Sequence, residues 1–288
     1  MGGPELLQQI VNGLAAGSVY VLIGLGLSLV FGILGIAHFA HGSVAMLGGY
    51  ATLILMKHLG INLWVAMLFA MPITAIVGVL LERLFYRPVR EAPPINTFII
   101  ALGLMFILDN IALLVFGPEQ TLIRSPYTDV VSVGSVNVVA LRIYMLGSNL
   151  VLLIALVVLL QRTKLGRAIR AVAQNRDAAA MVGVNVDWVS GAVFAIGSAL
   201  AAVAGAFVGS LTALYPSMGE ELVLKGFAVM ILGGMGSLVG AVLGGMIIGL
   251  TESLGGALIS SAYKGSFGFI ILILVLWFRP SGMFGKDV

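Results

Sequence analysis

The stretch FIIALGLMFILDNIALLVF, residues 98–116, is long enough to cross a bilayer as a helix and carries a single charge, at Asp109. Comparable apolar runs recur along the chain at 10–36, 38–57, 62–86, 95–116, 144–161, 189–213, 223–237, 238–257 and 262–278. The runs are continuous rather than alternating, which excludes a transmembrane β-barrel. The sequence therefore predicts an all-α polytopic membrane protein with about eight or nine transmembrane helices.

Composition supports this prediction. Hydrophobic residues make up 60% of the 288 positions and charged residues only 9%, whereas a soluble domain has about 25% charged residues. Most of the surface must therefore face lipid, and no polar stretch is long enough to build a second domain, so residues 1–288 are predicted to form one transmembrane domain. The absence of cysteine excludes disulfides and thiol-ligated metals. The net charge of +3 is better explained by orientation in the membrane than by nucleic-acid binding.

Basic residues predict the topology. They gather in three clusters, each at or just after the end of an apolar run. The first is Arg83, Arg87 and Arg90; the second is Arg162, Lys164, Arg167, Arg170 and Arg176; the third is Arg279 and Lys286. The positive-inside rule places all three clusters, and with them the C-terminus, in the cytoplasm. Residues 117–143 then form an external loop, in which PYTDVVSVGSVNV predicts a small extended or β-hairpin element. The short, glycine-rich run 223–237 is the candidate for a re-entrant segment.

Glycines recur at four-residue spacing, which aligns small residues on one face of a helix and lets a neighbouring backbone approach closely. Gly13 and Gly17, and Gly205 and Gly209, follow this spacing. The last glycine-rich region adds a longer set: Gly236, Gly240, Gly244, Gly245 and Gly249. Close packing within the chain is the first interpretation of the pattern, and a subunit interface or a moving seam along a pathway is the second.

No sequence of the Walker A, HExxH or nucleophile-elbow type is present, and no spacing typical of metal ligands. His38 and His41, in AHFAHGS, are interpreted as packing and hydrogen-bonding residues of a helix turn rather than as metal or proton sites. Ionisable residues inside apolar runs are costly and mark functional or pairing sites. Asp109 and Glu252 are of this kind, and Lys225 is a candidate partner for either. These residues line a pathway or pair two helices.

The loop of residues 162–188 holds the longest polar, basic segment, within QRTKLGRAIRAVAQNRDAAAMVGVNVDWVS. Apolar residues at helical spacing predict a short amphipathic helix from Thr163 to Gln174, outside the bilayer. We interpret the loop as a docking element for a cytoplasmic partner; the alternative is a solvated loop that only fixes topology. The alanines at 178–180 are small enough to lie in a groove on that partner, and Gly183 is suited to end their helix.

The same loop resembles the cytoplasmic coupling loop of bacterial ABC importer permeases, whose pattern is EAA followed after three residues by Gly. Asp177-Ala178-Ala179 and Gly183 match it, whereas Val193, Ala195 and Ile196 stand where the usual Ile, Leu and Pro would be. The chain is most similar to the Liv-type, hydrophobic (branched-chain) amino acid branch. Three further segments carry this resemblance, which extends from about residue 12 to 285. The first, near the N-terminus, holds Asn12-Gly13, Gly17, Tyr20, Phe31-Gly32, Phe39-Ala40-His41-Gly42 and Gly48-Gly49-Tyr50. The second is GGMGSLVGAVLGG and the third is WFRPSGMFG.

The resemblance implies a permease subunit of the bacterial inner membrane that translocates branched-chain amino acids by alternating access. Its implied partners are a second homologous permease, two cytoplasmic ATPase subunits and an external substrate-binding protein. ATP and magnesium would bind those ATPases, so this chain is expected to be no enzyme and to hold no cofactor. The implied coupling residues are Arg170, Asn175, Arg176, Asp177, Ala178, Ala179 and Gly183. A urea or short-chain amide importer remains the alternative; an ion-coupled secondary transporter would need more carboxylates than the chain offers.

Overall fold

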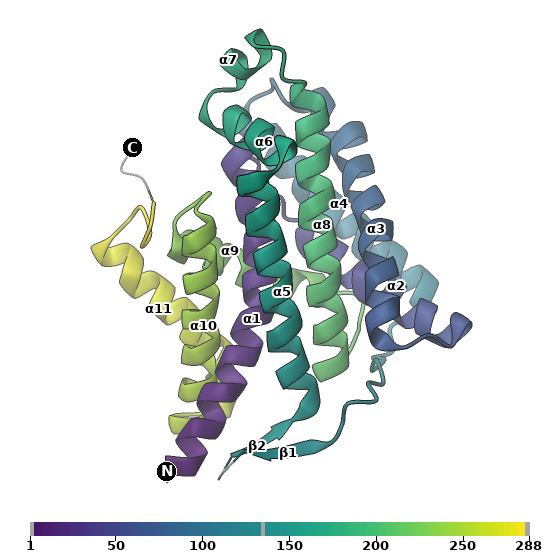
Figure 1. Cartoon of the computed structure of the whole chain (residues 1–288), viewed down its shortest axis with the longest axis vertical. Coiled ribbons are helices and arrows are strands. Elements are labelled where there is room, and N and C mark those ends of the chain that lie inside the picture. Colours follow the sequence, from purple (N-terminus) through teal and green to yellow (C-terminus); the bar gives the residue numbers. More distant parts are fainter. Residues whose placement is uncertain (1–2, 134–135, 286–288) are drawn as a thin grey trace.

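The computed structural model describes residues 3–133 and 136–285. The described part is almost entirely helical, with one two-stranded antiparallel hairpin (Figure 1). Its elements are α1 (Gly3–Leu34), α2 (His41–Leu59), α3 (Leu63–Leu81), the π-helical turn η1 (Glu82–Tyr86), the 3₁₀ turn η2 (Arg87–Val89), α4 (Pro94–Phe116), β1 (Val130–Val133), β2 (Val136–Val139), α5 (Ala140–Arg162), α6 (Lys164–Gln174), α7 (Arg176–Met181), α8 (Val186–Leu211), α9 (Met218–Gly233), α10 (Leu238–Leu258), the 3₁₀ turn η3 (Ser261–Tyr263) and α11 (Lys264–Phe278).

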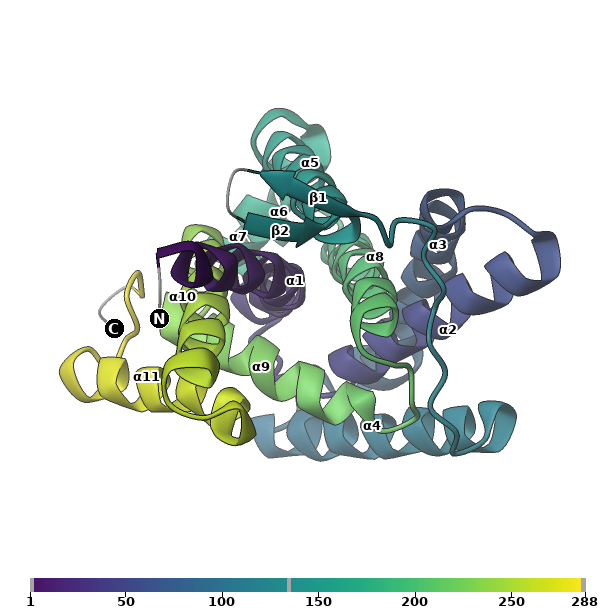
Figure 2. The same cartoon turned by 90° about the horizontal axis from the view of Figure 1, so that it is seen from below.

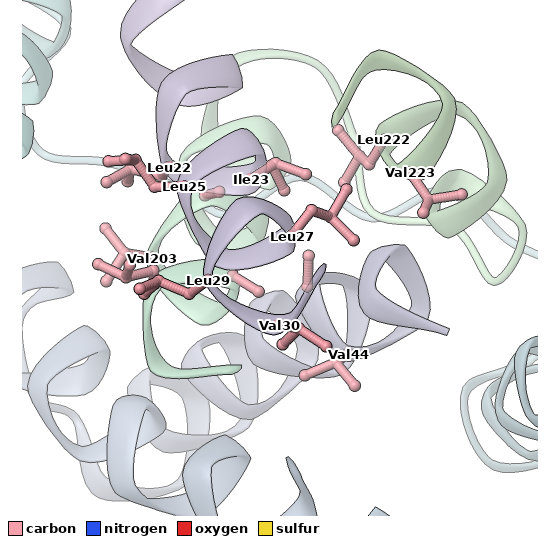
Figure 3. Packing of buried hydrophobic residues seen from close by; sticks show 14 of the residues in the cluster. Leu22, Ile23, Leu25, Leu27, Leu29, Val30, Val44, Val203, Leu222 and Val223 are labelled. Carbon is pink, nitrogen blue, oxygen red and sulfur yellow. The ribbon is translucent and has the colours of Figure 1, made fainter. Parts of the chain in front are cut away.

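Helix α1 forms the centre of the bundle, packed against α8, α9 and α10. Figure 3 shows Leu27 of α1 beside Leu222 of α9, and Val30 beside Val44 of α2. These side chains are buried, as is nearly every residue of α1 between Gly17 and Val30. Lipid tails are as apolar as leucine, so this core is held by close van der Waals packing rather than by exclusion of water.

Glycines permit that close packing where helix backbones meet. A Cβ added at Gly249 of α10 would overlap the backbone of Gly17 in α1. One at Gly240 would overlap Gly233 of α9, and one at Gly244 would lie 2.7 Å from the Val229 carbonyl oxygen. These are the contacts that the four-residue spacing predicts. The other two glycines of that set also face backbone: Gly236 lies against Gly32, with φ of 79°, and Gly245 lies against Val21.

The bundle has two chemically different ends (Figure 1). The β1–β2 hairpin, expected within residues 117–143, lies at the end where α1 begins, and the Asn137 amide donates to Gln8 Oε1 at 3.0 Å. We call this the hairpin end. Helices α6 and α7 lie at the opposite end, the loop end, where the basic clusters after α3 and α5 are also found. The segment after α11 returns to the end of α9, with Met283 N donating to the Leu232 oxygen at 2.9 Å.

The helix ends that carry the three basic clusters therefore lie toward one end of the bundle, as a common side of the membrane requires; Lys286 lies outside the described residues. The connection between α8 and α9 lies instead toward the hairpin end. There Leu214 exchanges two backbone hydrogen bonds with Thr121, of 2.7 and 2.9 Å, which tie this connection to the segment after α4.

Seven helices of the described chain are long and apolar enough to cross a membrane: Glu5–Leu34, Leu63–Val89, Pro94–Phe116, Ala140–Arg162, Val186–Leu211, Leu238–Leu258 and Ser261–Phe278. The apolar runs 38–57 and 223–237, counted among eight or nine predicted spans, correspond to α2 and α9, which are not among the seven. The 16 residues of α9 extend only about 24 Å, less than the hydrocarbon core. Figure 2 shows α9 running obliquely between α1 and α4.

Helices α2 and α9 also begin beside each other inside the bundle. A Cβ at Gly219, near the start of α9, would lie 2.7 Å from the Ser43 amide nitrogen near the start of α2. The ring of His41 lies against Gly26 in the middle of α1. Glycine contacts thus let both helices start against other helices, enclosed by protein. Non-helical backbone is tolerated at membrane depth where it is enclosed by protein.

Candidate functional site

The 162–188 loop is a rigid, folded element. The helix predicted from Thr163 to Gln174 is present as α6, with Thr163 as its N-cap. The Thr163 hydroxyl accepts from the Gly166 amide at 3.0 Å and donates to the Leu159 carbonyl oxygen at 2.6 Å. The Arg170 guanidinium donates to the Leu160 carbonyl oxygen. A Cβ at Gly166 would overlap those same carbonyls. Helix α6 is therefore folded tightly back onto the end of α5.

Helix α7 is short and capped at both ends. Asn175 is its N-cap, and the Asn175 Oδ1 accepts from the Ala178 amide at 2.9 Å. Asp177 lies in the first turn, where a negative charge is favourable to the helix dipole. Gly183 follows with φ of 86°, a left-handed conformation that costs residues with a Cβ free energy. Arg176 is half-buried at the start of α7. The chain then turns directly into α8.

The tip of the loop exposes apolar side chains. Met181 is 82% exposed and Val182 is 80% exposed, and Ala178 and Ala180 are exposed as well. Ala179 is different, because only 4% of it is exposed. The expectation that all three alanines lie against a partner is therefore wrong for Ala179, which packs inside this chain. The outward face of α7 and the apolar tip therefore lie exposed at the loop end.

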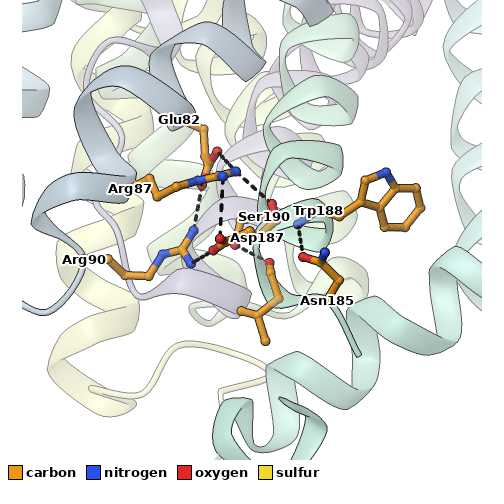
Figure 4. Close-up of polar contacts among 8 residues, drawn as sticks. Glu82, Arg87, Arg90, Asn185, Asp187, Trp188 and Ser190 are labelled. Atoms are coloured by element: carbon orange, nitrogen blue, oxygen red, sulfur yellow. Dashed lines mark hydrogen bonds and ion pairs between the residues drawn. The ribbon is translucent and has the colours of Figure 1, made fainter. Parts of the chain in front are cut away.

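A cluster of charges joins the loop to the rest of the bundle. We call it the arginine clamp; it consists of Glu82, Arg87, Arg90 and Asp187 (Figure 4). Glu82, which is fully buried in η1, pairs with Arg87 Nη2 at 2.9 Å and with Arg90 Nη2 at 2.6 Å. Arg90 Nη1 reaches Asp187 Oδ1 at 2.7 Å, and Arg87 Nη1 lies 3.6 Å from Asp187 Oδ2. The clamp fastens the end of α3 to the first turn of α8, directly after the loop.

The histidine pair, His38 and His41, is buried next to this clamp. His38 Nδ1 lies 2.7 Å from the Tyr86 hydroxyl, and its ring centroid is 5.0 Å from that of Phe194. Tyr86 is part of η1, and His41 packs against α1 and α8. No group of three or more histidine, aspartate or glutamate side chains in the described chain is placed to hold a metal. Aromatic packing and one hydrogen bond account for His38, whereas neither ring nitrogen of His41 has a hydrogen-bond partner in the described part of the chain.

Two of the three predicted intramembrane charges come together. The Lys225 ammonium of α9 pairs with Glu252 Oε1 of α10 and also donates to the Gly265 carbonyl oxygen at 2.9 Å. The Tyr20 hydroxyl of α1 donates to Glu252 Oε2 at 2.8 Å. Asp109 lies elsewhere, buried on α4, and neither of its carboxylate oxygens has a hydrogen-bond partner among residues 3–133 and 136–285. The pair and its two hydrogen-bond partners join four helices, α1, α9, α10 and α11, which explains why charge is retained inside the bundle.

A cavity of about 620 Å³ opens at the hairpin end, between α1, α5, α8, α9, α10 and the start of α11. Its polar lining includes Arg142, Glu221, Lys225, Ser253 and Lys264. The Arg142 guanidinium donates to Asn12 Oδ1, and Ser253 Oγ donates to the Gln9 carbonyl oxygen at 2.7 Å. Aliphatic residues line another part of the wall. This size and mixture of linings are typical of small-molecule sites.

Tyr215, in the connection between α8 and α9, borders the same cavity. Burial and then the neighbouring Glu221 carboxylate raise the pKa of the Tyr215 phenol above its usual range. The phenol therefore keeps its proton, and its hydroxyl lies 3.4 Å from Glu221 Oε2 as a donor.

Sequence reasoning missed two parts of the site. Arg87 and Arg90 were used only as topology signals, although Glu82 lies five and eight residues before them. Acidic and basic residues this close at the end of an apolar run were the available signal. Arg142, near the start of a span, and Glu221, near the start of α9, carried no such signal, because their common cavity is formed by helices distant in the sequence.

Comparison with known proteins agrees with the resemblance. Residues 9–276 match the family described as the permease component of branched-chain amino acid transport systems. The chain is 35% identical, over 97% of its length and 96% of the relative's, to the high-affinity branched-chain amino acid transport system permease protein LivH of Escherichia coli K12. It is 35% identical to BraD of Pseudomonas aeruginosa, which carries the same description, over 98% of both chains. It is 29% identical to the probable branched-chain amino acid transport permease LivH of Methanocaldococcus jannaschii, over 94% and 90%. The chain is therefore a multi-pass membrane protein that belongs to the family of branched-chain amino acid transport permeases.

Proposed function

We propose that the chain is the permease subunit of an ATP-driven importer that carries branched-chain amino acids inward across the cytoplasmic membrane. The observation that carries this proposal is the apolar tip of α7, formed by Met181 and Val182 at the loop end. Two large apolar side chains exposed on the side rich in arginine are suited to bury against a water-soluble partner. We take that partner to be a subunit that hydrolyses ATP; membership of a transport-permease family supports this, and this sequence has no Walker A segment of its own.

The full assembly that we propose has a second homologous permease. It also has two ATPase subunits, which bind at the loop end through α6–α7, and a substrate-binding protein, which binds at the hairpin end. ATP and magnesium bind the ATPase subunits, and this chain holds no cofactor. With the loop end in the cytoplasm, the hairpin and the 620 Å³ cavity face outward, toward the binding protein.

The clamp and the folded loop give the mechanism a physical basis. Helix α6 is fixed to α5 by the Arg170 contact with the Leu160 carbonyl, and the start of α8 is fixed to α3 by Asp187. A displacement of α7 by the ATPase therefore acts on α3, α5 and α8 together instead of being absorbed by a loose connection. Such rigid-body movement of helices is one physical form of alternating access.

The test is reconstitution of the complex in liposomes. The tagged chain, purified in mild detergent, should carry Walker-A-bearing subunits with it, and vesicles with internal ATP should take up leucine only when the binding protein is present. Excess isoleucine and valine should compete, whereas urea and acetamide should not. A chain that purifies alone and accumulates leucine on an ion gradient would contradict the proposal. Competition by urea but not by valine would favour the amide importers instead.

A further inference from the structure

The charges that line the 620 Å³ cavity are not balanced within this chain. Lys225 is neutralised by Glu252 in the cavity floor. Arg142, Lys264 and Glu221 also line the cavity, but none of them takes part in an ion pair with another described residue. Ionisable side chains within membrane helices normally pair with one another or serve a pathway. Arg142 is half-buried and Glu221 and Lys264 are exposed, so two cations and one carboxylate of the lining are accessible to a ligand that carries both signs of charge.

Arg142 is held in a fixed position that leaves most of its donors free. One terminal nitrogen of the guanidinium donates to Asn12, and the Asn12 amide is itself held by Gln9 at 3.4 Å. A guanidinium has five N–H donors in a planar fork that matches a carboxylate in two-point contact. The side chain is half-buried, so a carboxylate bound there would be partly shielded from water.

The opposite charge is supplied from another helix. Glu221 lies in the first turn of α9, and its neighbour Glu220 does not line the cavity. Tyr215 donates to the Glu221 carboxylate at 3.4 Å and thereby leaves its other acceptor positions available to an ammonium group.

Part of the cavity wall is aliphatic. Val19 of α1, Val208 of α8 and Leu222 of α9 line it, together with Met218. These residues are suited to a branched hydrocarbon side chain and offer it no hydrogen bonds, so removing that side chain from water would be favourable by area alone. A neutral, fully polar ligand would gain nothing from this wall.

We propose that this cavity is a binding site for an aliphatic α-amino acid, with Arg142 holding the carboxylate, Glu221 the ammonium group, and the wall of Val19, Val208 and Leu222 the side chain. Lys264, at the start of α11, adds a second positive charge to the lining. The choice of an amino acid rests on the proposed function; the fit to a ligand with both charges rests on the lining of the cavity. The site thus receives the substrate inside this chain before the pathway opens inward.

The test uses the natural absence of cysteine. Thr212→Cys and Gln120→Cys each place a thiol on the cavity lining, and Ser132→Cys places one on the exposed hairpin, away from it. In the complete complex in nanodiscs, without binding protein, L-leucine should slow maleimide labelling at 212 and 120 but not at 132. Isoamylamine and 4-methylpentanoate, which lack the carboxylate and the ammonium group respectively, should protect far less.

Charge variants then identify the two contacts. Arg142→Gln and Glu221→Gln should each raise the leucine concentration needed for protection about ten- to a hundredfold, the value of one charge-assisted contact. Arg124→Gln and Glu220→Gln, nearby charges outside the lining, should leave it unchanged. Equal protection by all three ligands, no protection by leucine, or thiols at 212 and 120 that never react would overturn the site. If the site fails these tests but the complex still imports leucine with its binding protein, the proposed function stands. If the complex without substitutions does not import leucine, the proposed function is contradicted.

Discussion

Removing the carboxylate at the centre of the arginine clamp should destabilise the protein far more than removing the carboxylate at its edge. Glu82 is fully buried and pairs with both Arg87 and Arg90, and Arg90 has only 8% of its side chain exposed. Truncating one member of a buried ion pair leaves an uncompensated charge and costs about 3–5 kcal/mol. Asp187 has 53% of its side chain exposed, and exposed pairs contribute about 0.2–1 kcal/mol. Glu82→Ala should therefore cost several times as much as Asp187→Ala.

The free energy of unfolding, measured by denaturant titration of the chain in defined micelles, tests this difference. Glu91→Ala is the matched control, because Glu91 is an exposed carboxylate one residue beyond Arg90 and forms no ion pair with a described residue. We expect the order Glu82→Ala, then Asp187→Ala, then Glu91→Ala, from largest loss to smallest. Equal losses at Glu82 and Asp187 would mean that the clamp is hydrated throughout, and would refute the low local dielectric on which the argument rests.

Three further predictions address topology, packing and coupling. A maleimide that cannot cross membranes should label Asn175→Cys only after the inner face is opened; labelling in intact cells would reverse the assigned sides. Gly240→Leu should reduce the yield of folded chain, because its Cβ would overlap Gly233, whereas Gly103→Leu, with open space around it, should not; equal yields would contradict the packing. Gly183→Val should abolish substrate-stimulated ATP hydrolysis, since it forces a β-branched residue to positive φ, and Ala180→Trp should do so by blocking the outward face of α7. In both variants permease abundance should remain normal, and full stimulation would exclude the loop as the coupling element.

The sequence predicted the helical membrane class well because lipid imposes a strong and local constraint. Each helix must supply an uninterrupted apolar run, and each of the nine runs overlaps a helix of the structure. The number of spans stays a prediction: seven helices of the described chain are long and apolar enough to cross a membrane, against about eight or nine expected. Hydrophobicity marks a segment as buried but does not distinguish lipid from protein as its surroundings. Helices α2 and α9 are enclosed by neighbours at their glycine-rich starts, so they need not span the full bilayer.

The loop was also predictable, because α6 and α7 are defined by local signals: an N-cap at Thr163, another at Asn175 and a left-handed glycine at 183. The burial of Ala179 was not, since the three alanines are identical in the sequence and only the packing of α7 on α8 distinguishes their faces. The cavity could not be predicted from the sequence, for a related reason. Its opposite charges, Arg142 and Glu221, are 79 residues apart by their numbers (221 − 142), and nothing local links them.

Helix α8 connects the two parts of the site directly. Its first turn carries Asp187 of the arginine clamp, immediately after the loop, and its last turns carry Val208 and Leu211 of the cavity wall. The 26 residues of α8 extend about 39 Å, enough to join the two ends of the bundle without a break. A Cβ at Gly205 would overlap the backbone of Ala45 in α2, so α8 has little freedom to bend or slide there on its own. We therefore expect a tilt of α8 imposed at the clamp to change the shape of the cavity wall, because a continuous helix that is closely packed in its middle moves as one body.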